Sequence, residues 1–247
     1  MKKFGLIGFP LGHSFSKKYF MEKFQREKID AEYLNFEIED IALFRDVIRD
    51  TDGLCGLNVT IPYKQAIIPY LDILSKEAQE VGAVNCVKIE RTDGKLILIG
   101  HNTDIYGFEC ALRGFIPSRV KRALILGSGG AACAVKYALT KSGAEVLTVS
   151  RTPKKEGDIS YREISDHLPD CELIVNATPI GMFPNVEDAP DIPYEYLGEE
   201  HYLFDLIYNP LKTKFMLQGR KMGAHTCNGM EMLIKQAEKA WEIWCEL

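Results

Sequence analysis

The chain has 247 residues, 46% of them hydrophobic, which is enough to bury one large core or two smaller ones. Its formal net charge at pH 7 is −5. A chain with this balance offers no global basic field for nucleic acid or an anionic membrane surface, so neither partner is expected.

The first residues, MKKFGLIGFPLGHS, hold only a short apolar run, which Gly5, Gly8 and Pro10 interrupt. That run is too short for the core of a signal peptide, and no later stretch is long enough to span a bilayer. The seven cysteines are scattered and form no C-x-x-C pair. Neither a disulfide framework nor a zinc site is expected, and the sequence predicts a protein of the reducing cytoplasm.

Strand and helix patterns alternate through the first hundred residues. The expected elements are strands at 4–8 and 31–38, helices at 14–28 and 39–50, and a hairpin over 85–100. Phe20 and Phe24 lie at helical spacing in the first of these helices. Asp93-Gly94 supplies the residues that a tight hairpin turn prefers.

A buried strand, a glycine-rich turn and a helix follow one another between residues 123 and 139. The turn, Gly127-Ser128-Gly129-Gly130-Ala131-Ala132, matches the pattern G-x-G-x-x-A. Gly127 permits the turn, Gly129 lets the backbone approach a pyrophosphate, and Ala132 allows the helix to pack closely on the strand. With further strand-like runs at 144–150, 171–178 and 201–207, the pattern predicts a parallel Rossmann sheet and favours a nucleotide site over a structural turn.

The end of the second Rossmann strand discriminates between dinucleotides. An acidic residue there binds the ribose 2′-hydroxyl of NAD, whereas the 2′-phosphate of NADP requires a cation. This chain has Ser150-Arg151-Thr152, followed by Lys154 and Lys155. An exposed basic turn is the alternative, but the position of Arg151 favours NADP.

Several polar residues of the first half could be solvated, could have a structural role or could belong to a functional site. Asn58 and Thr60 point to the same face of a strand, where they could simply be solvated. Lys64 follows Pro62, which suits the first turn of a helix, although the helix dipole disfavours a cation there. That cost suggests another purpose for Lys64.

Further polar residues accompany helices. Asp104 precedes a helical run and could be only an N-cap or a first-turn acid, and Ser16 is well placed to cap the helix after it. Ser14 has no such structural role. Gln236 sits beside the apolar stripe of an amphipathic helix near the C-terminus, so its amide needs a partner from a neighbouring loop or from a ligand. Gly229, one face-repeat earlier, could let a cofactor approach.

Taken together, these stretches resemble the shikimate dehydrogenase family from Phe4 to Gln236. The matching motifs are GFPLGHSFS, GLNVTIPYK, GAVNC, HNTDIYG, GSGGAACA, SRT, NATPIGM, DLIYNP and GMEMLIKQA. The resemblance implies an α/β chain with an N-terminal substrate-binding domain at 1–101, completed by a returning helix at 228–247. A doubly wound, Rossmann-type NADP-binding domain is expected at 102–227, with the active site at a cleft between the two.

The resemblance also implies site residues. Lys64 and Asp104 are expected to be the catalytic pair, and Ser14 and Ser16 to hold the substrate carboxylate. The residues expected to contact the ring hydroxyls are Asn58, Thr60, Asn85, Asp104, Tyr208 and Gln236. The residues expected to bind NADP are Gly127, Ser128, Gly129, Gly130, Ala131, Ser150, Arg151, Thr152, Thr178, Leu206, Gly229 and Met232.

The implied reaction is a reversible hydride transfer between NADPH and the ketone of 3-dehydroshikimate, giving shikimate on the route to chorismate and the aromatic amino acids. Lys64 is expected to donate to the ketone oxygen, with Asp104 orienting the hydroxyl and the ammonium, and no metal is required. A quinate or dual quinate/shikimate dehydrogenase is the close alternative, and a non-catalytic NADP-binding regulator a more distant one. The expected state is a monomer or homodimer.

This chain departs from the family pattern at a few positions. After Ser16 the family commonly has Pro and, soon after, His-Asn, whereas this chain has Lys17, Lys18 and Phe20-Met21. Cys86 stands where Thr is usual, and Ser150 stands where Asn is usual. They could alter affinity but leave the proposed chemistry in place.

Overall fold

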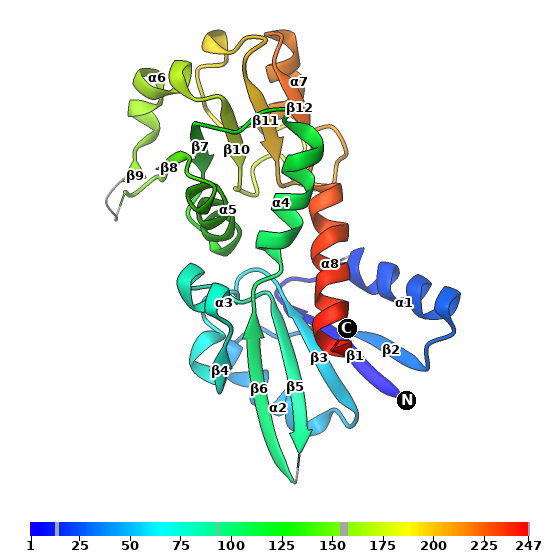
Figure 1. The fold of residues 1–247 in the computed structure, drawn as a ribbon. Coiled ribbons are helices and arrows are strands. Elements are labelled where there is room, and N and C mark those ends of the chain that lie inside the picture. The colour runs from blue at the N-terminus through cyan, green and yellow to red at the C-terminus, as the bar shows by residue number, and fades with distance from the viewer. Residues whose placement is uncertain (13–14, 93, 154–157, 247) are drawn as a thin grey trace. The chain divides into compact units, whose positions relative to one another are not determined.

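The computed structural model describes residues 1–12, 15–92, 94–153 and 158–246. The chain divides into two compact units. The first unit comprises Met1–Thr103 and Ala237–Leu247, and the second comprises Asp104–Gln236. The long helix α8 (Met230–Cys245) contributes residues to both (Figure 1).

The first unit is built on a mixed six-stranded sheet in the order β2-β1-β3-β5-β6-β4. Its strands are β1 (Lys2–Gly8), β2 (Ala31–Glu37), β3 (Leu54–Val59), β4 (Ile73–Leu74), β5 (Cys86–Thr92) and β6 (Lys95–His101). Strand β1 pairs in parallel with β2 and β3, whereas β5 runs antiparallel to β3 and β6. The β5–β6 pair confirms the predicted hairpin. In its turn Gly94 has φ of 75°, which only glycine adopts readily, and Asp93 lies outside the described residues.

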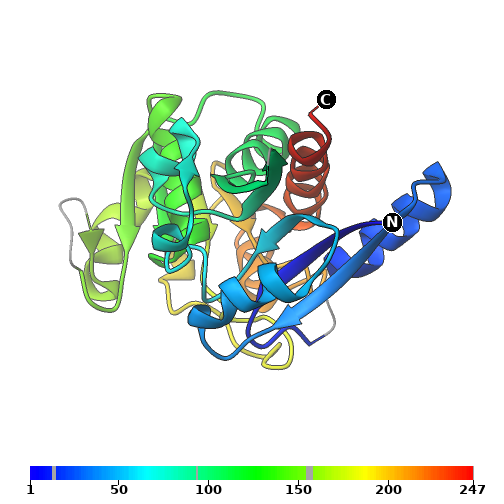
Figure 2. The same ribbon diagram turned by 90° about the horizontal axis from the view of Figure 1, so that it is seen from below.

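Helices cover both faces of this sheet, as can be followed in Figures 1 and 2. They are α1 (Phe15–Glu27), α2 (Phe44–Asp50) and α3 (Lys76–Val81), with the short 3₁₀ turns η1 (Ile41–Leu43) and η2 (Ile68–Tyr70). On one face, Phe20 and Phe24 of α1 and Trp244 of α8 pack on Phe4 and Tyr33. The helical spacing of Phe20 and Phe24 therefore marks the buried side of α1, as predicted.

The second unit holds a fully parallel sheet in the order β12-β11-β10-β7-β8-β9. Its strands are β7 (Arg122–Leu126), β8 (Glu145–Val149), β9 (Asp158–Ile159), β10 (Leu173–Asn176), β11 (Tyr202–Asp205) and β12 (His225–Cys227). Counted from β7, this is the strand order 3-2-1-4-5-6 of the doubly wound dinucleotide fold. The predicted Rossmann architecture is confirmed.

Alternate residues of the parallel strands face two layers of helices. Helices α6 (Ile164–His167) and α7 (Lys214–Lys221) lie in the layer that Leu124 and Leu203 face. On the other face Phe108 of α4 (Asp104–Phe115) lies 5.1 Å from Phe204, ring centroid to centroid. Helix α5 (Gly130–Lys141) packs beside α4 and against β7 and β8. Three short 3₁₀ turns complete the unit, η3 (Tyr161–Glu163), η4 (Leu168–Asp170) and η5 (Tyr194–Tyr196).

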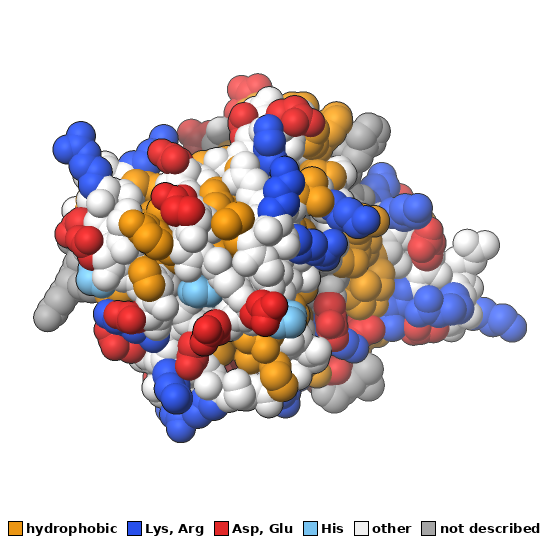
Figure 3. Space-filling view, turned by 90° about the horizontal axis from the view of Figure 1, so that it is seen from above, with side chains coloured by type: hydrophobic (Ala, Val, Ile, Leu, Met, Phe, Trp, Pro, Cys, Tyr) orange, Lys and Arg blue, Asp and Glu red, His pale blue; other side chains and the backbone are white. Residues whose placement is uncertain are grey.

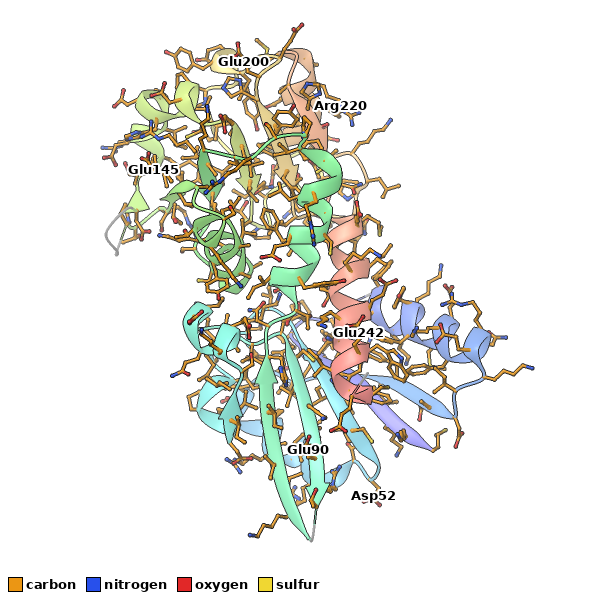
Figure 4. All side chains as sticks on the ribbon, in the orientation of Figure 1. Asp52, Glu90, Glu145, Glu200, Arg220 and Glu242 are labelled. Atoms are coloured by element: carbon orange, nitrogen blue, oxygen red, sulfur yellow. The ribbon has the colours of Figure 1, made fainter. Side chains whose placement is uncertain are left out.

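Charged side chains gather at the amino ends of the parallel strands. Arg122, which begins β7, pairs with Glu145 at the start of β8 and with Asp170, each at 3.2 Å from nitrogen to oxygen. Figure 4 labels Glu145 at this edge. Seen from above, acidic and basic side chains are interspersed on the surface (Figure 3), so this face presents no single-sign field.

Two local expectations were wrong. Lys64 does not begin a helix: residues 64–67 form a turn, and η2 starts only at Ile68. A tertiary hydrogen bond determines the conformation of this segment, because the Lys64 carbonyl accepts from the Val84 N–H at 2.7 Å. Ser16 is not a helix cap either, since α1 already begins at Phe15 and places Ser16 in its first turn.

Candidate active site

Asn85 is the centre of a buried polar group in the first unit. Its side-chain oxygen accepts the backbone N–H of Thr103 at 2.7 Å, and its amide nitrogen donates to the Thr103 hydroxyl at 3.0 Å. Its backbone carbonyl accepts from Val59 at 2.8 Å. Both Asn85 and Thr103 are buried. These bonds hold the residue before Asp104 to the end of β3.

The same stretch fixes the turn that carries Lys64. The backbone bond from Val84 to the Lys64 carbonyl joins this turn to the residue beside Asn85. The Lys64 side chain is half-buried. Residues 84–85 therefore connect the Lys64 turn, the end of β3 and Thr103 through hydrogen bonds. These bonds give a structural reason why the motifs GAVNC and GLNVTIPYK occur in the same chain.

Asn58 and Ser16 are linked through a residue that the sequence analysis did not single out. The buried Tyr33 hydroxyl donates to Asn58 Oδ1 at 2.8 Å, and the Ser16 side chain hydrogen-bonds the same hydroxyl. Burial, with the nearby Cys86 thiol, holds the pKa of Tyr33 well above its usual value, while the bond from Ser16 opposes that shift. Asn58 is 4% exposed, so the alternative that its side chain is merely solvated is wrong.

The remaining candidates of the first unit are placed more simply. Thr60 follows β3 and is half-buried, with its backbone N–H bonded to the Ile7 carbonyl at 2.9 Å. Ser14 lies outside the described residues. Cys86 is fully buried in the aromatic cluster with Tyr33 and Trp244, and burial raises the pKa of its thiol. This departure from the family pattern therefore belongs to the core.

Asp104 begins α4 and is buried, which confirms the prediction of a first-turn acid. One turn later, Gly107 meets the first turns of α8: a Cβ there would lie 2.6 Å from the Met232 carbonyl oxygen and 3.0 Å from Gln236 Cβ. Only glycine allows this approach. The Gln236 amide is buried and donates to the Leu233 carbonyl of its own helix at 2.8 Å.

The glycine-rich turn has the conformation that a dinucleotide site requires. Gly127 has φ of 105°, and its N–H bonds to the Val149 carbonyl at 2.9 Å. A Cβ built on Gly129, the N-cap of α5, would meet no atom within 4 Å. The turn therefore leaves open space at the helix N-terminus, where the dipole and unsatisfied N–H groups attract an anion. Ala132 is buried, as predicted for close packing of helix on strand. Ser128, Gly130 and Ala131 complete this turn and are at least partly exposed.

Arg151 lies in the bend that follows β8 and is exposed. An exposed guanidinium can donate hydrogen bonds to an anion. Ser150 and Thr152 stabilise the bend, because Ser150 Oγ accepts the Thr152 N–H at 3.2 Å. Lys154 and Lys155 lie outside the described residues. The turn and Arg151 together fit a dinucleotide that carries a 2′-phosphate.

A second polar network lies at the carboxyl ends of β10 and β11. The Asn176 side chain donates to Asp205 Oδ1 at 3.0 Å and accepts from the Thr178 hydroxyl at 2.7 Å and the Thr178 N–H at 3.1 Å. Asp205 also accepts from the Thr213 hydroxyl and from the Ile207 N–H. Burial raises the pKa of Asp205 to about 6, and these three hydrogen bonds oppose that rise.

Leu206 and Gly229 are brought together in this unit. A Cβ on Gly229 would clash with the Leu206 carbonyl oxygen, and the Gly229 N–H bonds to the Ile207 carbonyl at 3.0 Å. Close backbone packing thus already requires glycine here. Met232 is buried, and Tyr208 is half-buried with a pKa raised by burial.

The residues that the sequence analysis missed are Tyr33, Thr103, Asn176 and Asp205. Asn176 and Asp205 stand within the quoted motifs NATPIGM and DLIYNP, at strand ends where ligands bind in this fold, so the signal was present. Thr103 stands within HNTDIYG. Tyr33 gave a weaker signal, a tyrosine on a buried strand whose hydroxyl needs a partner. The described residues contain no His, Cys, Asp and Glu cluster that could hold a metal.

Comparison with known proteins places this geometry in a family. Residues 6–87 match the family model of the shikimate dehydrogenase substrate binding domain. The NADP(+) shikimate dehydrogenase of Clostridium beijerinckii is 41% identical over 100% of this chain and 93% of that protein. Among the described helices, none combines the length and the apolar character that a membrane span requires.

Solved structures agree along the whole chain. Shikimate 5-dehydrogenase from Thermus thermophilus, in complex with NADP(H) and shikimate, is 31% identical with a TM-score of 0.87, covering 100% of this chain and 94% of that one. Quinate dehydrogenase from Corynebacterium glutamicum, in complex with NAD, is 28% identical with a TM-score of 0.86 and the same coverage. The identity to the Clostridium protein over the full length shows that this chain belongs to the shikimate dehydrogenase family.

Proposed function

We propose that this chain is an NADP-dependent shikimate dehydrogenase, which catalyses the reversible reduction of 3-dehydroshikimate to shikimate on the route to chorismate and the aromatic amino acids. The observation that carries the proposal is the presence of both Lys64 and Asp104 in motifs that resemble the family pattern. It is supported by 41% identity over the full chain to an NADP(+) shikimate dehydrogenase. A regulator without catalysis would have no need for both.

The first unit binds the substrate in this proposal. Hydroxyls of Ser14 and Ser16 receive the carboxylate, and the neutral groups of Asn58, Thr60 and Asn85 receive ring hydroxyls. The hydrogen bonds around Asn85 and Tyr33 support this role, because they hold buried polar side chains in defined orientations before any ligand arrives. Asp104, Tyr208 and Gln236 are the other residues that we propose to contact ring hydroxyls.

Lys64 supplies the proton and the positive charge for the reaction. Reduction of a ketone builds negative charge on its oxygen, which an ammonium stabilises and then protonates. Asp104 accepts a hydrogen bond from the substrate hydroxyl and orients it and the ammonium. NADPH, when bound, supplies the hydride.

The second unit binds NADP. The open N-terminus of α5 at Gly129 supports a pyrophosphate site there, and the exposed guanidinium of Arg151 supports recognition of the 2′-phosphate. Thr178, Leu206, Gly229 and Met232 contact the rest of the cofactor. The Asn176–Asp205 network orients Thr178 for that contact.

Quinate is the second candidate substrate, because the Corynebacterium glutamicum quinate dehydrogenase has the same fold over the full chain. That relative is in complex with NAD, whereas Arg151 argues for NADP here.

Initial rates followed at the nicotinamide absorbance near 340 nm, with shikimate or quinate and with NADP or NAD, test the proposal. We expect the shikimate and NADP pair to be fastest, and no activity with any pair would reject the function.

We further propose that the enzyme works in the cytoplasm as a monomer or homodimer. All seven cysteines are free thiols, which fits a reducing compartment. Size-exclusion chromatography with light scattering measures the oligomeric state, and a trimer or larger assembly would contradict it.

A further inference from the structure

The buried hydroxyl of Tyr33 connects two of the candidate substrate-binding side chains. Tyr33 lies on β2, Asn58 on β3 and Ser16 in the first turn of α1, with β1 between the two strands. Phe4 of β1 pairs with Tyr33 on one side and with Gly56 on the other, so Tyr33 and Asn58 point to the same face of the sheet. Tyr33 reaches across β1 to Asn58 on that face.

The direction of the bonds determines what Asn58 offers to a ligand. Tyr33 has one hydroxyl proton and gives it to Asn58 Oδ1. The Asn58 amide nitrogen therefore points the other way, with one N–H toward the Asn85 carbonyl at 3.4 Å. Among the described residues no acceptor for its second N–H is recorded, so a ligand at this position can offer an acceptor atom to it.

Tyr33 itself is held rigidly. Its side chain is fully buried, and its ring stacks on Phe20 with centroids 4.7 Å apart and an angle of 9° between planes. Met21 Sδ also accepts the Tyr33 backbone N–H at 3.4 Å. A side chain that is held in one position restricts the orientation of the polar groups that it hydrogen-bonds.

We propose that Tyr33 is a positioning residue for substrate binding, which acts through Ser16 and Asn58 without touching the ligand. The inference rests on the proposed function, because it takes shikimate as the ligand of those two residues. Loss of the Tyr33 hydroxyl leaves the Asn58 amide free to rotate and removes the fixed neighbour of Ser16. Shikimate binding then weakens, while the cofactor site in the second unit is unaffected.

The test compares Tyr33→Phe with Tyr194→Phe, which also removes a hydrogen-bonded hydroxyl. Tyr194 belongs to the second unit, and its hydroxyl donates to the Pro190 carbonyl at 3.0 Å rather than to a candidate site residue. We expect Tyr33→Phe to raise both the KM and the calorimetric Kd for shikimate about three- to tenfold. Its KM for NADP, and all constants of Tyr194→Phe, should stay within about twofold of wild type.

A double-mutant cycle separates positioning from stability. If Tyr33 acts through Asn58, Tyr33→Phe should raise the shikimate KM less in an Asn58→Ala background than in the wild type. Full additivity, an unchanged shikimate KM, or an equal rise in the constants for shikimate and NADP would each overturn the inference. If the wild type oxidises shikimate and Tyr33→Phe has the same constants for shikimate as the wild type, this inference alone is rejected. If the wild type neither binds nor oxidises shikimate, the proposed function is rejected together with the inference.

Discussion

The Asp205 carboxylate accepts a hydrogen bond from the Asn176 side-chain amide, with 3.0 Å between Oδ1 and Nδ2. Asp205 ends β11 and Asn176 ends β10, so the carboxyl ends of two neighbouring parallel strands are tied together. Asn176 in turn holds Thr178. A buried carboxylate thus supports the loop that we assign to the cofactor.

Asp205 should make stability fall as pH rises through the weakly acidic range. Its pKa is raised to about 6 from an ordinary 3.8, so the folded state favours the protonated form. The resulting stabilisation is complete below pH 4 and is lost as pH rises through 6. Relative to Asp205→Asn, the wild-type free energy of unfolding should fall by up to about 3 kcal/mol between pH 4 and 7. Urea unfolding at several pH values measures this difference, and a constant difference would contradict the prediction.

Gly129→Ala should impair NADP binding without destabilising the fold. A Cβ at Gly129 meets no protein atom within 4 Å, and neither does a Cβ at Gly198, which makes Gly198→Ala the matched control. At Gly129 the methyl group would occupy the space in which the pyrophosphate approaches the backbone. We expect a rise of about tenfold or more in the KM for NADP, on the scale of one or more lost hydrogen bonds to a charged group. Equal KM values in the two variants would exclude a pyrophosphate at this turn.

Arg151→Ala should remove the preference for NADP over NAD. The guanidinium can bind the 2′-phosphate with charge-assisted bonds of about 1.5–3 kcal/mol, so the KM for NADP should rise about ten- to hundredfold. NAD lacks that phosphate, and its KM should change little. Arg162→Ala, a nearby exposed arginine on η3, is the control. An unchanged ratio of the two KM values in Arg151→Ala would show that another group selects the cofactor.

Lys64→Ala should lower turnover by about a hundredfold or more, the scale expected for a positioned proton donor. The KM for shikimate should change much less, since the proposed role lies in the chemical step. Lys76→Ala removes another lysine of the same unit, one at the first position of α3, and should leave turnover unchanged. Near-normal turnover in Lys64→Ala would show that a different group donates the proton.

Much of the fold was predictable because local patterns and tertiary structure agree. The apolar runs of β7, β8, β10 and β11 and the glycine turn required a parallel Rossmann sheet, and Phe20 and Phe24 marked the buried side of α1. The short strands β4, β9 and β12 left no periodic signal, since each has only two or three residues. Lys64 was misplaced in a helix because a backbone bond to Val84, twenty residues later in the chain, decides its turn.

The candidate site was predictable to the extent that its residues stand in matched motifs. The roles of Asn85 and Thr103 depend on a hydrogen bond between segments 18 residues apart, which no local pattern records. Tyr33 and Asn58 meet only because β1 lies between their strands. The sheet order and register thus supply what the sequence could not.

The central claim is that the chain moves a hydride between carbon 3 of shikimate and the nicotinamide of NADP. Oxidation of shikimate deuterated at carbon 3, with mass spectrometry of the reduced cofactor, tests this most directly. We predict reduced NADP that carries one deuterium per molecule, formed in equal amount with 3-dehydroshikimate. Reduced cofactor without deuterium, or no reduced cofactor from shikimate and NADP, would contradict the claim.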